Sequence, residues 1–407
     1  MLKPTHIQGV SLEDLAAQFG TPLYLYDGEK IVHQINALQQ AFAAVPLRIK
    51  YATKALSSLG ILRLIRKAGA ELDAVSIEEV KLGLLAGSTP AEIMYTPSGV
   101  SFAEIQEAVQ IGVMVNLDSL PLLERFGQTY VSTVPVCIRI NPHILAGGNL
   151  KISVGHKDSK FGISIEQLPQ ILELVQQYQI TVVGLHLHTG SDILDASVFL
   201  KGGNVLFEAA LHFPNLKFLD FGGGFKVGYH PDDKATDVAE VGRIVGEAFQ
   251  AFCAKYGRQL ELWIEPGKFL VSEAGYLVVK TTVVKETPTL NFVGVDSGLN
   301  HLIRPMMYDA YHHIYNLSNP TGTLHTYTIV GYICETDTLG SQRELNMVTE
   351  GDLLVIQNAG AYGFTMASNY NARLRPAEVL VWEGKAFLIR ERERFEDLLR
   401  NQVSIDL

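Results

Sequence analysis

The feature that most constrains this chain is a regular alternation of apolar, strand-like runs with helix-like segments. The strand-like runs occupy residues 48–53, 71–75, 92–95, 113–116, 134–140, 181–188, 217–221 and 261–265. Eight such units over about 220 residues are typical of an α/β fold of the (β/α)8 TIM-barrel type, whose usual size is about 250 residues. A doubly wound open sheet is the competing fold, but eight even units favour a closed barrel.

The rhythm changes after Gly267. Strand-like runs follow at 278–285, 291–295, 323–331, 352–356, 378–382 and 385–390, most of them without helices between. This pattern predicts a second, C-terminal all-β domain. The early run Leu23–Tyr26 has no place in the barrel and is expected to join that domain. The predicted division is a barrel of residues 28–272 and a β domain of residues 1–27 and 273–407.

Composition narrows the choice of partners and compartment. The 407 residues are 47% hydrophobic and 19% charged, which suits a large core. The formal net charge is -10 and there is no basic run, which argues against nucleic acid or a membrane as partner. Cys137, Cys253 and Cys334 are few and widely separated, which predicts free thiols and a cytoplasmic location.

In such a barrel the active site lies at the carboxyl ends of the strands. Polar residues stand at most of these ends: Lys54, Asp73, Ser76, Arg139, Asn141, His186, His188, Asp220 and Glu265. Taken alone, Lys54 would be expected at a strand tip with its ammonium group in water. A lysine among so many polar groups on the catalytic face instead suggests a reactive amine that forms a Schiff base.

A glycine triplet, Gly222-Gly223-Gly224, directly follows the seventh strand. Glycines there allow backbone N–H groups to approach an anion, and the loops after strands seven and eight are the usual phosphate site of the fold. A phosphate site beside an inward lysine suggests pyridoxal phosphate. Glu265 could then face the pyridine nitrogen, or be a strand-end glutamate in a surface ion pair. His188 could stack on the ring, or be a core histidine bonded to backbone.

The pair His186 and His188 supports a rival interpretation, because two imidazoles on one face of a strand can bind a metal. Further ligands would have to come from Asp73 and Asp220, and a glycine triplet has no role at a metal. No metal is therefore expected, and a metal-dependent barrel hydrolase is a distant alternative.

The β domain carries polar groups of its own. Arg304 suits a fork-like contact to a carboxylate. Cys334, beside Glu335 and Asp337, is expected to keep its thiol protonated and able to donate a proton. The plainer alternatives are a buried small hydrophobe for Cys334 and a solvated loop cation for Arg304.

Together these motifs resemble the pyridoxal-phosphate-dependent decarboxylases of the alanine-racemase-like fold, in the family's order and over nearly the whole chain. The motifs are Tyr51-Ala52-Thr53-Lys54, Ser159-Lys160-Phe161-Gly162, His186 to Ser191, Gly222 to Gly224, Glu265-Pro266-Gly267, Cys334 to Asp337 and Gly360-Ala361-Tyr362. Within the family, the segment Leu302 to Tyr308, with Tyr311 and His312, most favours meso-2,6-diaminopimelate as substrate. The implied reaction yields L-lysine and CO2, the last step of lysine biosynthesis.

The resemblance implies roles for single residues. Lys54 would form the Schiff base, and Cys334, contributed by the second subunit of a homodimer with shared sites, would be the proton donor. The other cofactor-binding residues would be Asp73, His188, Ser191, Gly222, Gly223, Gly224, Glu265, Pro266, Gly267, Lys268 and Tyr362. The substrate-binding residues would be Lys268, Arg304, Tyr308, Glu335 and Tyr362.

Lys268 departs from the family pattern, which usually has arginine after Glu-Pro-Gly. Lysine keeps the charge but loses the bidentate fork, so Lys268 is expected to hold the same anion less rigidly. Ornithine, arginine and carboxynorspermidine remain alternative substrates. Racemases of the same fold pair the ring nitrogen with arginine and lack the Cys334 motif. A third alternative is a non-catalytic cofactor carrier built on the same barrel. Such carriers resemble only the barrel part of this chain, so the β domain with Cys334 argues against this class.

Overall fold

The computed structural model describes residues 3–144 and 155–407, which form two compact units. The barrel unit consists of Val32–Val227 and Lys234–Leu270, and the β unit of Met1–Ile31, Gly228–Asp233 and Val271–Leu407. None of the described helices is long and apolar enough to cross a membrane.

The barrel unit is a closed barrel of eight parallel strands, as the alternation predicted. The strands are β4 (Leu47–Ala52), β5 (Glu71–Ala74), β6 (Ile93–Tyr95), β7 (Met114–Leu117), β8 (Val136–Asn141), β10 (Val182–His186), β11 (Phe218–Asp220) and β12 (Glu261–Ile264). β12 pairs with β4 and closes the sheet. The short strand β9 (Ile163–Ser164) is added at the end of β8.

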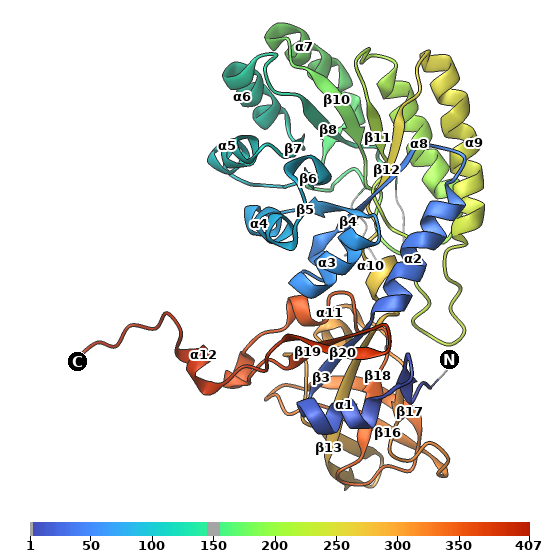
Figure 1. Cartoon of the computed structure of the whole chain (residues 1–407), viewed down its shortest axis with the longest axis vertical. Coiled ribbons are helices and arrows are strands. Elements are labelled where there is room, and N and C mark those ends of the chain that lie inside the picture. Colours follow the sequence, from blue (N-terminus) through green and yellow to red (C-terminus); the bar gives the residue numbers. More distant parts are fainter. Residues whose placement is uncertain (1–2, 145–154) are drawn as a thin grey trace. The chain divides into compact units, whose positions relative to one another are not determined.

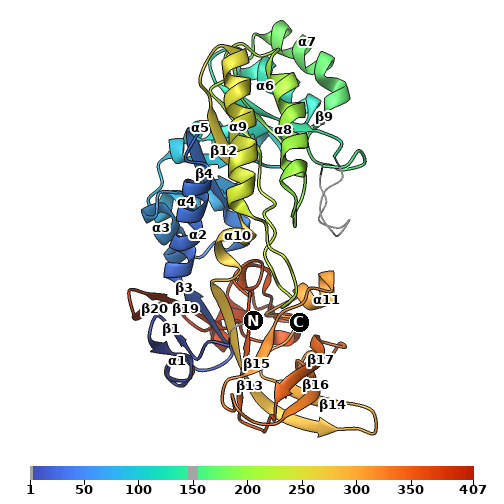
Figure 2. The ribbon, with the colours of Figure 1, turned by 90° about the vertical axis from the view of Figure 1, so that its right-hand side faces the viewer.

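Helices alternate with the strands and lie outside them (Figure 1). They are α2 (Gly28–Ala41), α3 (Leu59–Lys67), α4 (Ile77–Ala86), α5 (Phe102–Ile111), α6 (Leu120–Tyr130), α7 (Leu168–Tyr178), α8 (Ala196–Ala210), α9 (Val238–Tyr256) and the short α10 (Lys268–Val271). Local chemistry sets several ends: the Ser76 hydroxyl accepts the Glu79 N–H at the start of α4, and Gly87 ends that helix in a left-handed conformation. α8 and α9 lie side by side (Figure 2).

The interior of the barrel is closed below the strand ends by side chains that face inward. Lys50 is fully buried there, with Nζ 2.5 Å from Glu71 Oε2 and 4.1 Å from the centre of the Trp263 ring. The Trp263 ring in turn stacks on Phe218. A buried ammonium group is tolerated because it has both an ion pair and an aromatic face.

The β unit is built on a mixed sheet in the order β17-β16-β14-β13-β3-β19-β20, with β18 paired to β13 and β15. The strands are β3 (Leu23–Asp27), β13 (Gly275–Glu286), β14 (Asn291–Val295), β15 (Ile314–Asn316), β16 (Leu324–Val330), β17 (Thr338–Asn346), β18 (Leu353–Ile356), β19 (Ala377–Trp382) and β20 (Lys385–Arg390). The predicted N-terminal strand is confirmed, because β3 lies between β13 and β19. β13 extends along the length of this unit (Figure 2).

Short helices also belong to the β unit. They are α1 (Leu12–Phe19), α11 (Arg304–Tyr308) and α12 (Phe395–Leu399), and a small hairpin of β1 (His6–Ile7) and β2 (Val10–Ser11) precedes α1. Leu12, Leu15, Leu23 and Leu25 pack with Val278, Val355 and Val379 in its core. α1 thus covers part of the sheet.

Two glycines of α9 provide a matched test of helix packing in the barrel unit. A Cβ at Gly242 would lie 2.1 Å from the carbonyl oxygen of Ala41, whereas one at Gly246 would meet nothing closer than 3.9 Å. Gly242→Ala should therefore destabilise the protein by about 1–3 kcal/mol. Gly246→Ala should stabilise it by up to about 1 kcal/mol, because alanine favours the helix. Urea-unfolding midpoints check both; equal shifts would contradict the packing.

Candidate active site

The reactive lysine predicted from the sequence lies where the first barrel strand ends. Lys54 is in a short 3-10 turn (Thr53–Ala55) directly after β4, and its side chain is 43% exposed. Asp73 on the neighbouring strand β5 is buried, with Oδ2 3.9 Å from Lys54 Nζ. The pairing of Ala52 with Asp73 brings these two side chains together. Burial, and then the charge of Glu265, raise the pKa of Asp73 to about 8, although Lys54 opposes the shift.

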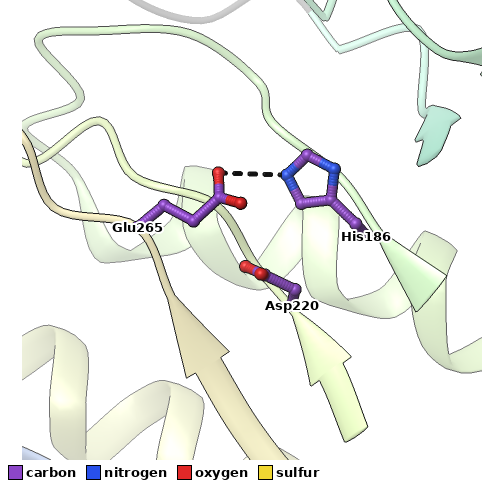
Figure 3. Close-up of side chains that lie close together, drawn as sticks. All are labelled: His186, Asp220 and Glu265. Carbon is purple, nitrogen blue, oxygen red and sulfur yellow. Dashed lines mark hydrogen bonds and ion pairs between the residues drawn. The ribbon is translucent and has the colours of Figure 1, made fainter. Parts of the chain in front are cut away.

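The ends of β10, β11 and β12 bring together His186, Asp220 and Glu265 (Figure 3). His186 Nε2 lies 3.2 Å from Glu265 Oε2, and His186 Nδ1 lies 2.9 Å from the amide nitrogen of Asn116 on β7. Asp220 Oδ1 accepts the Gly222 N–H at 2.8 Å. All three side chains of Figure 3 are buried.

Burial and mutual charge set the protonation of this group. Burial raises the pKa of Glu265, but His186, Lys54 and His188 outweigh it and hold the pKa at about 2. Burial and the Glu265 charge raise the pKa of Asp220 well above its usual range. Burial lowers the pKa of His186 despite the nearby Glu265. These shifts favour the ionised form of Glu265 and the neutral forms of Asp220 and His186.

His186 and His188, which the sequence suggested as a possible metal pair, have separate surroundings. His188 Nδ1 accepts the Gly223 N–H at 3.2 Å, and burial, with Arg139 and Lys54 nearby, lowers the pKa of His188 to about 3. Among the described residues, the ligand atoms close enough to share an ion belong to the three residues of Figure 3, not to His188.

The glycine triplet is required by close packing of the backbone. A Cβ at Gly223 would lie 2.2 Å from the Glu265 carbonyl oxygen, and one at Gly224 would lie 2.4 Å from the Gly190 carbonyl oxygen. Gly222 and Gly224 also have positive φ angles of 64° and 115°. The Gly222 and Gly223 amides already donate to side chains, whereas no hydrogen bond among the described residues uses the Gly224 amide. The loop offers that donor to an anion.

The segment after Glu265 returns to the first strand. The Pro266 carbonyl accepts the Ala52 N–H at 3.3 Å, and the Gly267 carbonyl accepts the Leu270 N–H as α10 begins. Lys268 is buried, and its Nζ lies 2.5 Å from Asp192 Oδ1, next to Ser191. The Asp192 carboxylate thus already pairs with the Lys268 ammonium, which the sequence pattern predicted to bind the phosphate or the substrate.

In the β unit, Arg304 is buried at the start of α11. Its guanidinium lies 5.1 Å from the Tyr229 ring and 6.0 Å from the Tyr308 ring. Its Nε is a buried donor without a partner among the described residues. Tyr362 adopts a φ of 56°, uncommon for a residue with a side chain and often found at functional sites.

Cys334 is an exposed free thiol, not a buried small hydrophobe. The amide nitrogen of Asn371 lies 3.0 Å from its sulfur, and the Tyr370 hydroxyl donates to Glu335 at 2.8 Å. The Asp337 carboxylate accepts the N–H groups of Leu299 and Ile333, and Ile333 directly precedes Cys334 in the chain.

Sequence reasoning left several residues of these clusters without a role, namely Asn116, Asp192, Tyr370 and Asn371. A polar Asn116 at the end of an apolar strand was the available signal for the first. Asp192 directly follows the predicted Ser191. Tyr370 and Asn371 lie in a polar segment whose proximity to Cys334 depends on the fold.

Comparisons with known proteins agree with this geometry. Residues 28–272 match the family model "Pyridoxal-dependent decarboxylase, pyridoxal binding domain". The diaminopimelate decarboxylase of Methanothermobacter thermautotrophicus is 37% identical over 97% of this chain and 95% of its own length. That of Neisseria meningitidis serogroup B is 38% identical over 96% and 95%. This chain belongs to the diaminopimelate decarboxylase family.

Solved structures of the family are closely similar to this chain. A diaminopimelate decarboxylase with 33% identity has a TM-score of 0.90 and covers 97% of both chains. The Helicobacter pylori enzyme, complexed with L-lysine, has 32% identity and a TM-score of 0.88, covering 95% of this chain and 98% of its own. The cofactor of this pyridoxal-dependent family is pyridoxal phosphate.

The residues present fit that cofactor. Glu265 Oε1 is buried without a hydrogen-bond partner among the described residues, as an acceptor for a pyridine N–H must be. The Gly222–Gly224 loop leaves no room for side chains and has an amide to offer a phosphate. Lys54 Nζ lies 3.9 Å from Asp73 Oδ2, and its charge helps to lower the pKa of Glu265.

Asp73→Asn should flatten the pH dependence of stability of the cofactor-free protein. With a pKa of about 8, folded Asp73 holds a proton that the unfolded chain releases above about pH 4. Stability therefore falls as the pH rises from about 4 to about 8, by at most about 1.4 kcal/mol per unit. Asparagine removes this titration. Urea midpoints of both proteins across this window check it; parallel curves would contradict the protonated Asp73.

Proposed function

We propose that this protein decarboxylates meso-2,6-diaminopimelate to L-lysine and CO2, the last step of lysine biosynthesis. The observation that carries the proposal is the buried, ionised Glu265, whose Oε1 has no partner among the described residues of a barrel that also presents Lys54. A carboxylate facing the pyridine nitrogen suits a reaction that needs a strong electron sink. Relatives named diaminopimelate decarboxylase over nearly the full length support this substrate.

Pyridoxal phosphate, when bound, supplies the sink for the electron pair left behind as CO2 departs. Lys54 is proposed to hold it covalently through Nζ, and the 43% exposed side chain leaves that amine accessible. Glu265 keeps a proton on the ring nitrogen, because its own pKa of about 2 leaves Oε1 as an acceptor. Asp73, protonated near neutral pH, adds no second full charge beside Lys54.

The remaining barrel residues are proposed to position the cofactor. His188 is neutral and its Nδ1 is fixed by the Gly223 N–H, which suits a ring that stacks on the cofactor face. Ser191, the triplet Gly222, Gly223 and Gly224, and Tyr362 are proposed for the phosphate. Pro266 and Gly267 set the path of the chain beside it. Lys268 contributes to phosphate or substrate binding together with its partner Asp192.

The β unit is proposed to supply the contacts to the substrate. Arg304 has a buried Nε donor without a described partner, which suits a carboxylate at the far end of the substrate. Tyr308, Glu335 and Tyr362 join it, with Lys268 of the barrel. Cys334 is proposed as the proton donor after CO2 leaves, and its exposed sulfur is accessible for that role.

We further propose the barrel of residues 28–272 as the cofactor-binding domain, and residues 1–27 and 273–407 as the domain that completes the substrate site. Within these ranges, residues 1–2 and 145–154 lie outside the described part. A cytoplasmic location is proposed because Cys137, Cys253 and Cys334 are all free thiols, as in a reducing compartment.

Lys54→Ala should abolish turnover and the visible absorbance of the covalently bound cofactor. The control is Lys50→Met, which removes a lysine of the same strand that is buried against Glu71 and Trp263. That variant should retain the absorbance even if its stability falls. Spectra of the purified proteins with added pyridoxal phosphate check this. Covalent cofactor in Lys54→Ala would refute the assignment.

CO2 release across a panel of diaminopimelate, ornithine, arginine and carboxynorspermidine should show preference for diaminopimelate. Arg304→Met should raise KM for diaminopimelate by roughly ten- to a hundredfold, since it removes charge-assisted hydrogen bonds. The control is Arg343→Met, whose guanidinium likewise lies over a tyrosine, 3.6 Å from the Tyr311 ring. Equal effects of both variants, or a better substrate elsewhere in the panel, would contradict the substrate assignment.

We propose that the protein acts as a homodimer in which Cys334 serves the site of the partner subunit. Lys54→Ala and Cys334→Ala subunits, each inactive alone, should regain roughly a quarter of wild-type activity when mixed and allowed to exchange, because each hybrid has one intact site. Absence of any recovery, with exchange shown by differently tagged subunits, would argue that sites are not shared.

A further inference from the structure

His186 is a buried histidine that no role in the proposed reaction yet uses. It lies at the end of β10, and both of its ring nitrogens have polar neighbours, Asn116 and Glu265 (Figure 3 shows the second). The register of the barrel creates this arrangement, because His186 pairs with Asp220 on β11 and with Arg139 on β8.

The neighbours fix the tautomer of His186. An amide NH2 group can only donate, so the Asn116 amide nitrogen, 2.9 Å away, requires a bare His186 Nδ1. The proton of the neutral ring is then on Nε2, which donates to Glu265 Oε2 at 3.2 Å. The opposite amide orientation would place a bare Nε2 against a carboxylate oxygen, where two acceptors repel.

This hydrogen bond leaves the two oxygens of Glu265 unequal. Oε2 is engaged by His186, and Oε1 is buried without a partner among the described residues. Asp220 accepts the Gly222 N–H through Oδ1, and its Oδ2 is buried without a partner among the described residues.

We propose that His186 is a positioning residue: held by Asn116, it donates to Glu265 and so aims Glu265 Oε1 at the cofactor's ring nitrogen. This inference rests on the role of Glu265 in the proposed function. Without His186, Glu265 is free to turn toward Asp220 and share its proton, as closely spaced carboxyl groups do. The carboxylate would then hold the ring proton less firmly.

A pair of cofactors tests this without measuring activity. Pyridoxal phosphate and its 1-deaza analogue, with C–H in place of the ring nitrogen, both bind covalently to a lysine, so the ratio of their dissociation constants isolates the contact to the nitrogen. The wild-type protein, stripped of cofactor, should prefer pyridoxal phosphate by at least about tenfold. His186→Leu should reduce this preference several-fold, and His186→Gln, which keeps a donor near Nε2, should restore most of it.

The matched control is His301→Leu in the β unit. His301 is also buried and also bonded at both ring nitrogens, to Ser297 Oγ at 3.1 Å and to the Leu374 carbonyl at 3.0 Å. Its removal should lower the thermal unfolding midpoint but leave the cofactor preference unchanged. A loss of preference in both leucine variants would mean that general destabilisation explains the effect, and would overturn the inference.

The remaining outcomes are distinct. If His186→Leu keeps the wild-type preference for pyridoxal phosphate, the proposed role of His186 is overturned, but the role of Glu265 is not. A wild-type protein that binds both cofactors equally overturns the role of Glu265 and this inference with it. If circular dichroism shows that His186→Leu is unfolded, the Asn116→Leu variant tests the inference instead. This variant keeps the His186 ring but removes the amide that fixes its tautomer. A preference reduced in Asn116→Leu supports the inference, and an unchanged one overturns it.

Discussion

The pairing of the last barrel strand with the first is the interaction on which the site depends. β12 joins β4 in the register Leu262 with Leu47 and Ile264 with Ile49, and the Pro266 carbonyl then accepts the Ala52 N–H. These contacts place Glu265 at the same end of the barrel as Lys54, although the two are far apart in sequence. An open sheet of the same strands would leave them at opposite edges.

Closure of the barrel also brings three carboxyl groups together, and their mutual repulsion shapes the protonation of the site. Asp73, Asp220 and Glu265 are all buried at one end of the barrel, where three negative charges would repel strongly. The pKa values separate instead: those of Asp73 and Asp220 are raised, and that of Glu265 is held at about 2. These shifts favour Glu265 as the ionised carboxylate of the three, and Glu265 is the one with a hydrogen-bond donor, His186, on one oxygen.

Local pattern was sufficient for the barrel, because the strands are apolar runs at regular intervals and their carboxyl ends converge in any parallel barrel. It predicted Lys54 and Glu265 for that reason. It missed β15 and β17, since the polar run Thr338–Asn346 becomes a strand only through pairing with β16. It also did not predict the hydrogen bonds that the Asp337 carboxylate accepts from Leu299 and Ile333. Side-chain direction and contacts from a distant loop, here Asn371, are not encoded in local spacing.

Lys50 and Lys54 differ in their surroundings because they lie at different depths in the barrel. Alternation along the strand places Lys50 and Lys54 on one face, so the pattern alone treats them alike. Lys50 is enclosed, ion-paired to Glu71 and covered by Trp263, and burial lowers its pKa. Lys54 lies beyond the strand end, partly exposed, 3.9 Å from a carboxyl group that is largely protonated near neutral pH. A lysine in a tight ion pair would be held away from an incoming aldehyde. The raised pKa of Asp73 therefore weakens the electrostatic attraction between its carboxyl group and the Lys54 ammonium, which would suit the Schiff-base role proposed for that amine.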